Sequence, residues 1–301
     1  MNIVMEYGDK PDLISTKNWD FAFYGNEIDD RCKDAIEYTK TKSFCQILTI
    51  YHPETYQLVF DGNEIIECYE IADYLKEKGI NEQSNVLLEC TSLGVVEMLL
   101  LIQTIKDLQI SHFDSLYLEP HKYLRRYENF SERHHFHLTK LFEGFLGIPQ
   151  HYMAFETNDK AVVLCGFESE RVGRVFEELD LQGPNCQLLF GMPPYTVGWD
   201  MNTYANHLPI IDRYRISTEF YYAGASNPLA VYEKLERVYN GLSEDQKLFI
   251  LPFGTKPMSL GACIFKVLHD SNKLSILYDH PDREKDRSKN VKQWNLYKVF
   301  L

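Results

Sequence analysis

One segment of the chain recurs further along it, and this repeat constrains the fold more than any other feature of the sequence. Residues 21–53 align without a gap with residues 162–194. Each copy is typical of a strand, a Gly-x-Glu turn, a helix and a second strand, so the repeat predicts two βαβ units. Chance similarity between two such segments is the alternative. The identical pairs are Gly25 and Gly166, Glu27 and Glu168, Glu37 and Glu178, Cys45 and Cys186, Gln46 and Gln187, Leu48 and Leu189, and Pro53 and Pro194.

The elements that follow each copy keep the same order. Residues 86–120 and residues 248–281 both have the pattern of a strand, a turn containing Ser-Leu-Gly, a helix and another strand. We therefore predict an α/β fold with two tandem Rossmann-like open parallel sheets, related by an internal pseudo-two-fold duplication.

The expected domain boundaries follow from the repeat. The first Rossmann-like half is predicted at residues 1–124, a connector at 125–158 and the second half at 159–301. The last residues, QWNLYKVFL, have strand character and are expected to add an edge strand to the second half.

The charge balance limits the partners. Against 31 basic residues there are 44 acidic ones, a net charge of −13. A protein that coats long nucleic acid needs a basic surplus to displace phosphate counterions, so only a small basic pocket for a nucleotide is plausible. The apolar run near residues 95–102 is too short to cross a bilayer, and the N-terminus lacks the pattern of a secretory signal. We expect a cytoplasmic protein with no membrane partner.

The seven cysteines form an odd number with no CxxC pair. This usage indicates reduced, mostly buried thiols, without disulfides or a zinc site. The sequence also lacks a GxGxxG fingerprint, a Walker motif and a nucleophile elbow, so no cofactor is predicted.

Four loops are candidates for ligand binding. In an open parallel sheet, ligands bind beyond the carboxyl ends of the strands, where free amides at helix N-termini favour anions. The rule selects residues 25–31, 90–94, 166–171 and 254–258. The candidate ligand-binding residues are Gly25, Asn26, Glu27, Thr91, Ser92, Gly166, Glu168, Arg171, Gly254, Thr255 and Lys256.

The turn Gly-Thr-Lys-Pro-Met at residues 254–258 is the most specific of these loops. Pro257 suits the start of a helix, and Thr255 suits the capping position. Lys256 would then stand at the positive end of a helix dipole, which is unfavourable unless an anion such as a phosphate lies nearby. The alternative is that Lys256 extends into solvent.

This turn resembles the loop of CARF domains and of the related SAVED domains, which are Rossmann-like sensors of cyclic oligonucleotides in prokaryotic antiphage systems. The resemblance is carried by residues 254–258 and, more loosely, by residues 90–92. It implies a nucleotide sensor, and the duplicated chain is similar to the fused plan of SAVED. Because no effector domain is recognisable in the sequence, the resemblance implies a separate effector partner.

Glu27 and Glu168 occupy equivalent positions in the repeat, and three roles are open for them. They could divide acid and base roles in catalysis, contact ribose hydroxyls, or cap the following helices with Arg31 and Arg171 as ion-pair partners.

Three further segments have both a functional and a structural interpretation. His134 and His137 have the spacing of a metal-binding pair or of a surface helix. The aromatic segment 192–211 suits either a lid that stacks on a base or packing over the sheet edge. The charged run 280–292 suits a solvated loop or one that folds over an anionic ligand.

The sequence supports three hypotheses about function. The leading one is a sensor that binds a small nucleotide or another phosphorylated ligand and acts through a separate effector. The second is an enzyme that cleaves or modifies a nucleotide or phosphorylated sugar, with Glu27 and Glu168 as catalytic candidates. The third is a scaffold subunit of a defence complex.

Overall fold

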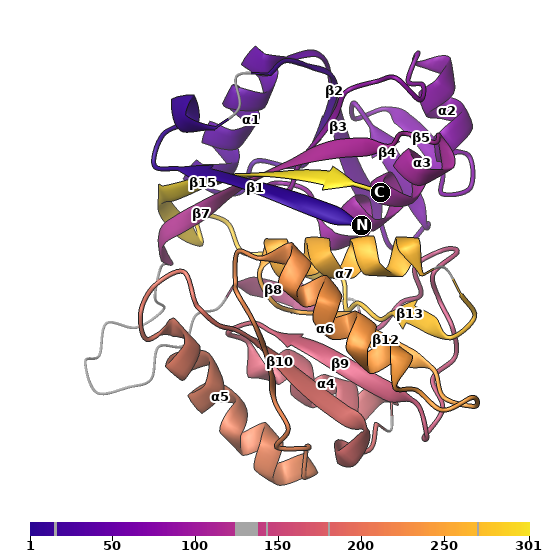
Figure 1. The fold of residues 1–301 in the computed structure, drawn as a ribbon, viewed down its shortest axis with the longest axis vertical. Helices are drawn as coiled ribbons and strands as arrows, with labels where there is room; N and C mark the ends of the chain where they lie inside the picture. The colour runs from indigo at the N-terminus through magenta and orange to yellow at the C-terminus, as the bar shows by residue number, and fades with distance from the viewer. Residues whose placement is uncertain (15–16, 124–137, 143, 180, 270) are drawn as a thin grey trace. The chain divides into compact units, whose positions relative to one another are not determined.

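The chain folds into two compact units (Figure 1). Unit 1 comprises Met1–Leu124 together with Glu284–Leu301, and unit 2 comprises Arg125–Arg283. In the sequence, unit 2 is therefore an insertion within unit 1. The computed structural model describes residues 1–14, 17–123, 138–142, 144–179, 181–269 and 271–301.

Unit 1 is built on one eight-stranded sheet. The central strands β7, β6, β2 and β3 are parallel. An antiparallel pair flanks this centre on each side, formed by β15 and β1 and by β4 and β5. In spatial order the strands are β1 (Asn2–Gly8), β15 (Ser288–Phe300), β7 (His112–Tyr123), β6 (Val86–Glu89), β2 (Trp19–Tyr24), β3 (Ser43–His52), β4 (Gln57–Phe60) and β5 (Glu64–Glu67).

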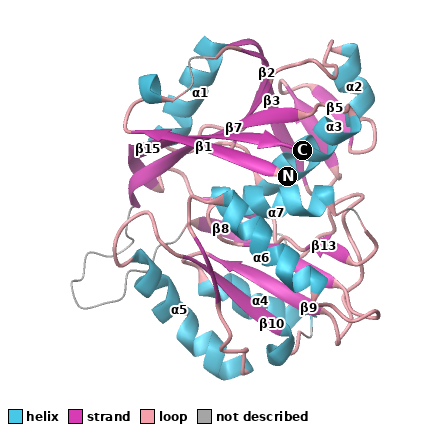
Figure 2. Cartoon of the chain, in the orientation of Figure 1, coloured by secondary structure: helices cyan, strands magenta, loops and turns pink. Residues whose placement is uncertain are grey.

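Helices α1 (Asp30–Lys42), α2 (Ile71–Glu77) and α3 (Val95–Asp107) connect the strands of unit 1 (Figure 2). The crossovers from β2 to β3 and from β6 to β7 lead in opposite directions across the sheet. Because such crossovers are right-handed, α1 and α3 cover opposite faces. Ala35 of α1 packs in a buried cluster with Trp19 and Leu296, while α3 is apolar around most of its circumference and almost fully buried.

Unit 2 has a five-stranded sheet in which every pairing is parallel. Its spatial order is β11 (Tyr221–Ala223), β10 (Cys186–Gly191), β9 (Lys160–Cys165), β12 (Leu248–Pro252) and β13 (Leu274–Ile276). A separate ribbon pairs β8 (Thr139–Phe142) with β14 (Pro281–Arg283). The helices are α4 (Ser169–Leu179), α5 (Trp199–Tyr214), α6 (Pro228–Asn240) and α7 (Lys256–Leu268).

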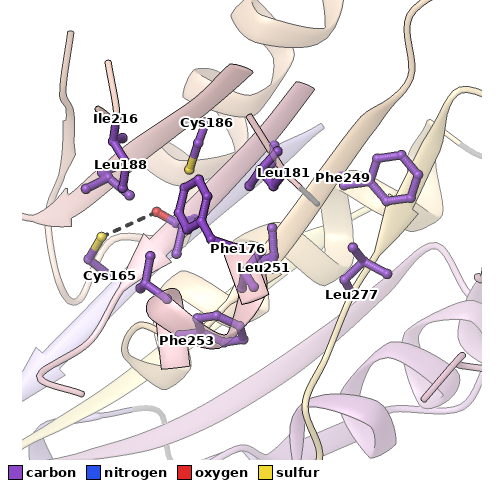
Figure 3. Close-up of a cluster of buried hydrophobic side chains, with 14 of the residues drawn as sticks. Cys165, Phe176, Leu181, Cys186, Leu188, Ile216, Phe249, Leu251, Phe253 and Leu277 are labelled. Atoms are coloured by element: carbon purple, nitrogen blue, oxygen red, sulfur yellow. Dashed lines mark hydrogen bonds between the residues drawn. The ribbon is translucent and has the colours of Figure 1, made fainter. Parts of the chain in front are cut away.

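The core of unit 2 lies between its sheet and helices α4 and α5. Figure 3 shows part of this cluster, in which Phe176 of α4 packs with Leu188 and Phe253. The connections through α6 and α7 run the other way across the sheet, so these two helices cover its second face. They pack closely, because a Cβ on Gly261 of α7 would lie 2.3 Å from the carbonyl oxygen of Pro228.

The α/β class with parallel-stranded sheets is confirmed. The strand order of unit 2 is that of a doubly wound Rossmann sheet. Six of the seven cysteines are buried and Cys45 is half-buried, in agreement with the expected buried thiols. Within the described ranges, each helix is too short or too polar to cross a lipid bilayer.

The C-terminal strand differs from the expectation. It was expected at the edge of the second half, but β15 lies in the sheet of unit 1, between β1 and β7. It pairs with β7 from Ser288, opposite Tyr123, to Phe300, opposite His112. Apolar residues on both of its faces are buried, including Trp294, Leu296 and Val299. The antiparallel pairings of β15, together with those of β4, make the sheet of unit 1 mixed rather than purely parallel.

Candidate ligand site at the strand ends of unit 2

In each unit, the chain adds strands towards one edge of the sheet, starting from the first strand of the repeat, and then adds later strands towards the other edge. This change of direction lies beside the first strand of the repeat. Crevices at such points are the usual ligand sites of open α/β sheets. In unit 2 the reversal lies between β9 and β12, so the loops at Gly166 and Gly254 meet there. They touch directly, because a Cβ on Gly166 would lie 2.2 Å from the carbonyl oxygen of Phe253. Glycine is therefore required at Gly166 for this packing.

The turn that follows β12 has the predicted cap. Thr255 is the N-cap of α7 and has an extended backbone, and its Oγ1 accepts a hydrogen bond from the amide of Met258 at 3.4 Å. The same hydroxyl donates to the carbonyl oxygen of Ala225 at 2.5 Å. Lys256 is the first residue of the helix and is half-buried. The predicted capping role of Thr255 is confirmed.

Arg171, in the first turn of α4, is held rigidly and is only 6% exposed. Its Nε and Nη2 donate to the two carboxylate oxygens of Asp279 at 2.8 Å and 2.5 Å. The guanidinium carbon lies 4.3 Å from the ring centre of Phe253 and 5.7 Å from that of Tyr278. Burial disfavours the charged form, but the ion pair with Asp279 raises the pKa of Arg171 above its ordinary value.

One nitrogen of this guanidinium remains available. Among the residues that the structure describes, Nη1 of Arg171 has no hydrogen-bond partner. An arginine fixed by a bidentate carboxylate loses little conformational entropy when it binds something else. The Nη1 edge is therefore a preorganised donor beside Phe253, which leads directly into the turn at Gly254.

Glu168 makes hydrogen bonds that were not predicted from the sequence. Its Oε1 accepts hydrogen bonds from the amides of Leu138 and Thr139, at 2.9 Å and 3.0 Å, and from Oγ1 of Thr139 at 2.9 Å. The carboxylate thus anchors the start of β8. The ion-pair partner of Arg171 is Asp279. This partner was not predicted from the sequence, although Asp279 directly follows Tyr278 at the end of a predicted strand.

The corresponding loops of unit 1 are closed by internal hydrogen bonds. Glu89 is fully buried, and its carboxylate accepts bonds from the amides of Thr91 and Ser92 and from the hydroxyl of Ser92. The amide of Gly25 donates to Oγ of Ser92 at 2.8 Å, and Oγ1 of Thr91 accepts from the amide of Leu118. Burial raises the pKa of Glu89, although these hydrogen bonds oppose the change. The two hydroxyls therefore hold the turn in place.

Asp29, and not Glu27, caps α1. Its Oδ1 accepts from the amide of Cys32 at 3.1 Å, and its Oδ2 accepts from Arg31 at 3.0 Å and from Ser288 at 2.5 Å. Burial alone would raise the pKa of Asp29, but Arg31, Ser288 and Arg287 together lower it to about 2. Glu27 and its neighbour Asn26 are exposed. An Asp-Asp pair before a helical pattern was the sequence signal for this cap.

Arg31 is fully enclosed, in contrast to Arg171. Its Nε donates to Ser288 at 2.7 Å, its Nη1 donates to the carbonyl oxygen of Leu118 at 2.9 Å, and its Nη2 donates to Asp29. The side chain is 2% exposed. The strand-end arginine of unit 1 is therefore a structural lock, whereas that of unit 2 keeps one open edge.

The other candidate segments have mainly structural roles. In the segment 192–211, Tyr195 is buried, and Trp199 packs edge-on against Phe167, so the aromatic packing interpretation is favoured. The charged run continues into β15, where Lys292 pairs with Glu119 at 2.9 Å. His134 and His137 lie outside the described residues. Within those described, no three His, Cys, Asp or Glu side chains gather as a metal site would require.

Comparisons with known proteins add little to this picture. No protein-family model matches the chain, and no curated protein matches its sequence. One similar solved structure is of A-type ketoreductases from a modular polyketide synthase, with 10% identity, 89% of this chain and 70% of that chain covered, and a TM-score of 0.23. Another is a ketoreductase domain from the bacillaene assembly line, with 9% identity, coverages of 88% and 69%, and a TM-score of 0.24.

Proposed function

We propose that the chain binds a nucleotide or another phosphorylated small molecule at the strand ends of unit 2. The observation that carries this proposal is the Nη1 edge of Arg171, which has no partner among the described residues, on a guanidinium held against the ring of Phe253, the residue before the turn that begins α7. A buried, fixed guanidinium with an unused donor suits a ligand rich in oxygen acceptors.

The attraction for phosphate comes from three groups in this region. Asp279 offsets the charge of Arg171, so the guanidinium contributes direction more than net charge. The positive end of the α7 dipole and the ammonium group of Lys256 contribute the positive potential. Together they provide a cation, the positive end of a helix dipole and a planar donor, a combination that suits phosphate oxygens.

We infer that the two units descend from one ancestor and that only unit 2 has kept a ligand site. Both units carry an arginine in the first turn of the helix after the first repeated strand, and each arginine reaches the strand end near Tyr117 or Tyr278. In unit 1 the chain supplies its own partners to Arg31 and closes the loop at Ser92. One ligand per chain is the expected stoichiometry, and unit 1 is the part that suits a scaffold role.

The ligand class we propose is a cyclic oligonucleotide, and the role is sensing in prokaryotic antiphage defence through a separate effector protein in the cytoplasm. The support is the resemblance of the Gly254–Met258 turn to the loop of CARF and SAVED domains. The enzymatic alternative relied on Glu27 and Glu168, which now have different surroundings: Glu27 is exposed, and Glu168 anchors β8.

Titration calorimetry with cyclic di-, tri- and tetranucleotides, and with linear mononucleotides, tests the proposal. We expect one cyclic ligand to bind with a stoichiometry of one per chain. Hydrogen bonds to charged groups are worth about 1.5–3 kcal/mol, so Lys256→Ala and Arg171→Lys should each weaken binding about tenfold to a hundredfold.

Arg237→Ala is the matched control for charge, because Arg237 is exposed and lies in the last turn of α6. The affinity of this variant for the cyclic nucleotide should equal that of the wild type. Absence of heat with every ligand, or unchanged affinity in Lys256→Ala, would overturn the proposal. Mass spectrometry of the recovered ligand separates sensing from turnover, since a sensor returns the ligand intact.

A further inference from the structure

The loops that follow β10 and β11 are tied to each other by backbone hydrogen bonds. The amide of Met192 donates to the carbonyl oxygen of Ala223 at 2.8 Å, and the amide of Ala225 donates to that of Pro193 at 3.0 Å. Tyr195 completes this connection. It is 6% exposed, and its hydroxyl donates to the carbonyl oxygen of Ala225 at 3.2 Å.

The same carbonyl of Ala225 also accepts the hydroxyl of Thr255, at 2.5 Å. A threonine hydroxyl has one proton, so donating it to Ala225 leaves the oxygen lone pairs of Thr255 for the amide of Met258. The Ala225 carbonyl therefore orients the hydroxyl proton of Thr255, the cap of α7. Through this one oxygen atom, the loop at Tyr195 is connected to the turn that contains Lys256.

We infer that Tyr195 is a positioning residue for the ligand turn. This inference rests on the proposed function, because the turn matters only if it binds a ligand. The phenol, packed in a buried site, fixes the Ala225 carbonyl, and the carbonyl orients the hydroxyl of Thr255. The hydroxyl in turn holds the amide of Met258 in the first turn of α7. Tyr195 acts on the turn through the Ala225 carbonyl and Thr255.

Hydrogen exchange of the Met258 amide tests the connection without any ligand. One neutral hydrogen bond is worth about 0.5–1.5 kcal/mol, so Tyr195→Phe should speed this exchange about threefold to tenfold. Thr255→Val should speed it further, and Thr255→Ser, which keeps the hydroxyl, should restore it. Tyr222→Phe is the matched control, since Tyr222 is exposed on β11. Unchanged exchange in Tyr195→Phe overturns the inference.

Ligand affinity provides the second measurement. Tyr195→Phe should weaken binding of the cyclic nucleotide about threefold to tenfold, with the protein still folded in the absence of ligand. In the double variant, Tyr195→Phe should cause no loss of affinity beyond that of Thr255→Val. Both substitutions act through the carbonyl of Ala225. Equal affinity of wild type and Tyr195→Phe overturns the inference, whereas absence of binding by the wild type overturns the proposed function.

Discussion

Deletion of residues 288–301 is expected to unfold unit 1 and to leave unit 2 folded. The deletion removes β15, which lies between β1 and β7 and buries Trp294, Leu296, Tyr297 and Val299. Each large apolar side chain contributes about 1.5–3 kcal/mol when buried, so their loss is comparable to the whole stability of a domain, about 5–15 kcal/mol. Limited proteolysis with mass spectrometry should show unit 1 digested and unit 2 intact.

Deletion of residues 1–8 is the matched control, because it removes the neighbouring strand β1 from the edge of the same sheet. Only Ile3 of that strand is buried. The smaller apolar area predicts a partial loss of stability with unit 1 still resistant to protease. A protease-resistant unit 1 in the variant that lacks residues 288–301 would contradict the role of β15.

The position of β15 also explains why the sequence predicted the wrong sheet for it. The strand character of QWNLYKVFL is local and was recognisable, but its partner strand β7 ends at Tyr123, far back in the chain. Sequence patterns report which residues form a strand and give little information about non-local pairing. Nothing in the alternation of residues 293–301 distinguishes one sheet edge from another.

The parallel centres of the sheets were predictable because the rules that govern them are general. The spacing of a strand, helix and strand predicts a right-handed crossover, and the crossovers leave few possible strand orders. The cap at Thr255 was predictable for a similar reason, since a threonine followed two residues later by proline satisfies the first turn of a helix locally.

The partners of the charged residues were less predictable. Glu27 and Glu168 are equivalent in the repeat, yet one is exposed and the other accepts three hydrogen bonds at the start of β8. The difference arises from β8, a segment of unit 2 with no counterpart in the first copy. Asp29 and Asp279 became the buried counter-ions because each stands beside an arginine at a strand end.

The stability of the protein should fall between pH 6.5 and pH 4 because of His207. This side chain of α5 is 0% exposed and packs edge-on against Phe190. Its Nδ1 lies 2.8 Å from the carbonyl oxygen of Thr203, and Nε2 has no partner within the described part of the chain. Burial lowers the pKa of His207 from 6.5 to about 4, although the bond to Thr203 opposes the change.

The direction of this pH dependence follows from proton binding in the folded and unfolded states. Below pH 6.5 the unfolded chain binds a proton at His207 and the folded chain does not, so stability is lost as the pH falls towards 4. A difference of this size corresponds to about 3 kcal/mol.

Urea unfolding at pH 7, 5.5 and 4 tests this prediction. The free energy of unfolding should fall less with pH in His207→Gln than in the wild type. In His121→Gln, whose side chain is exposed, the pH dependence should equal that of the wild type. Asp29, with its pKa near 2, contributes only below about pH 4, so its effect does not overlap with that of His207. Equal pH dependence in wild type and His207→Gln would contradict the lowered pKa of His207 in the folded protein.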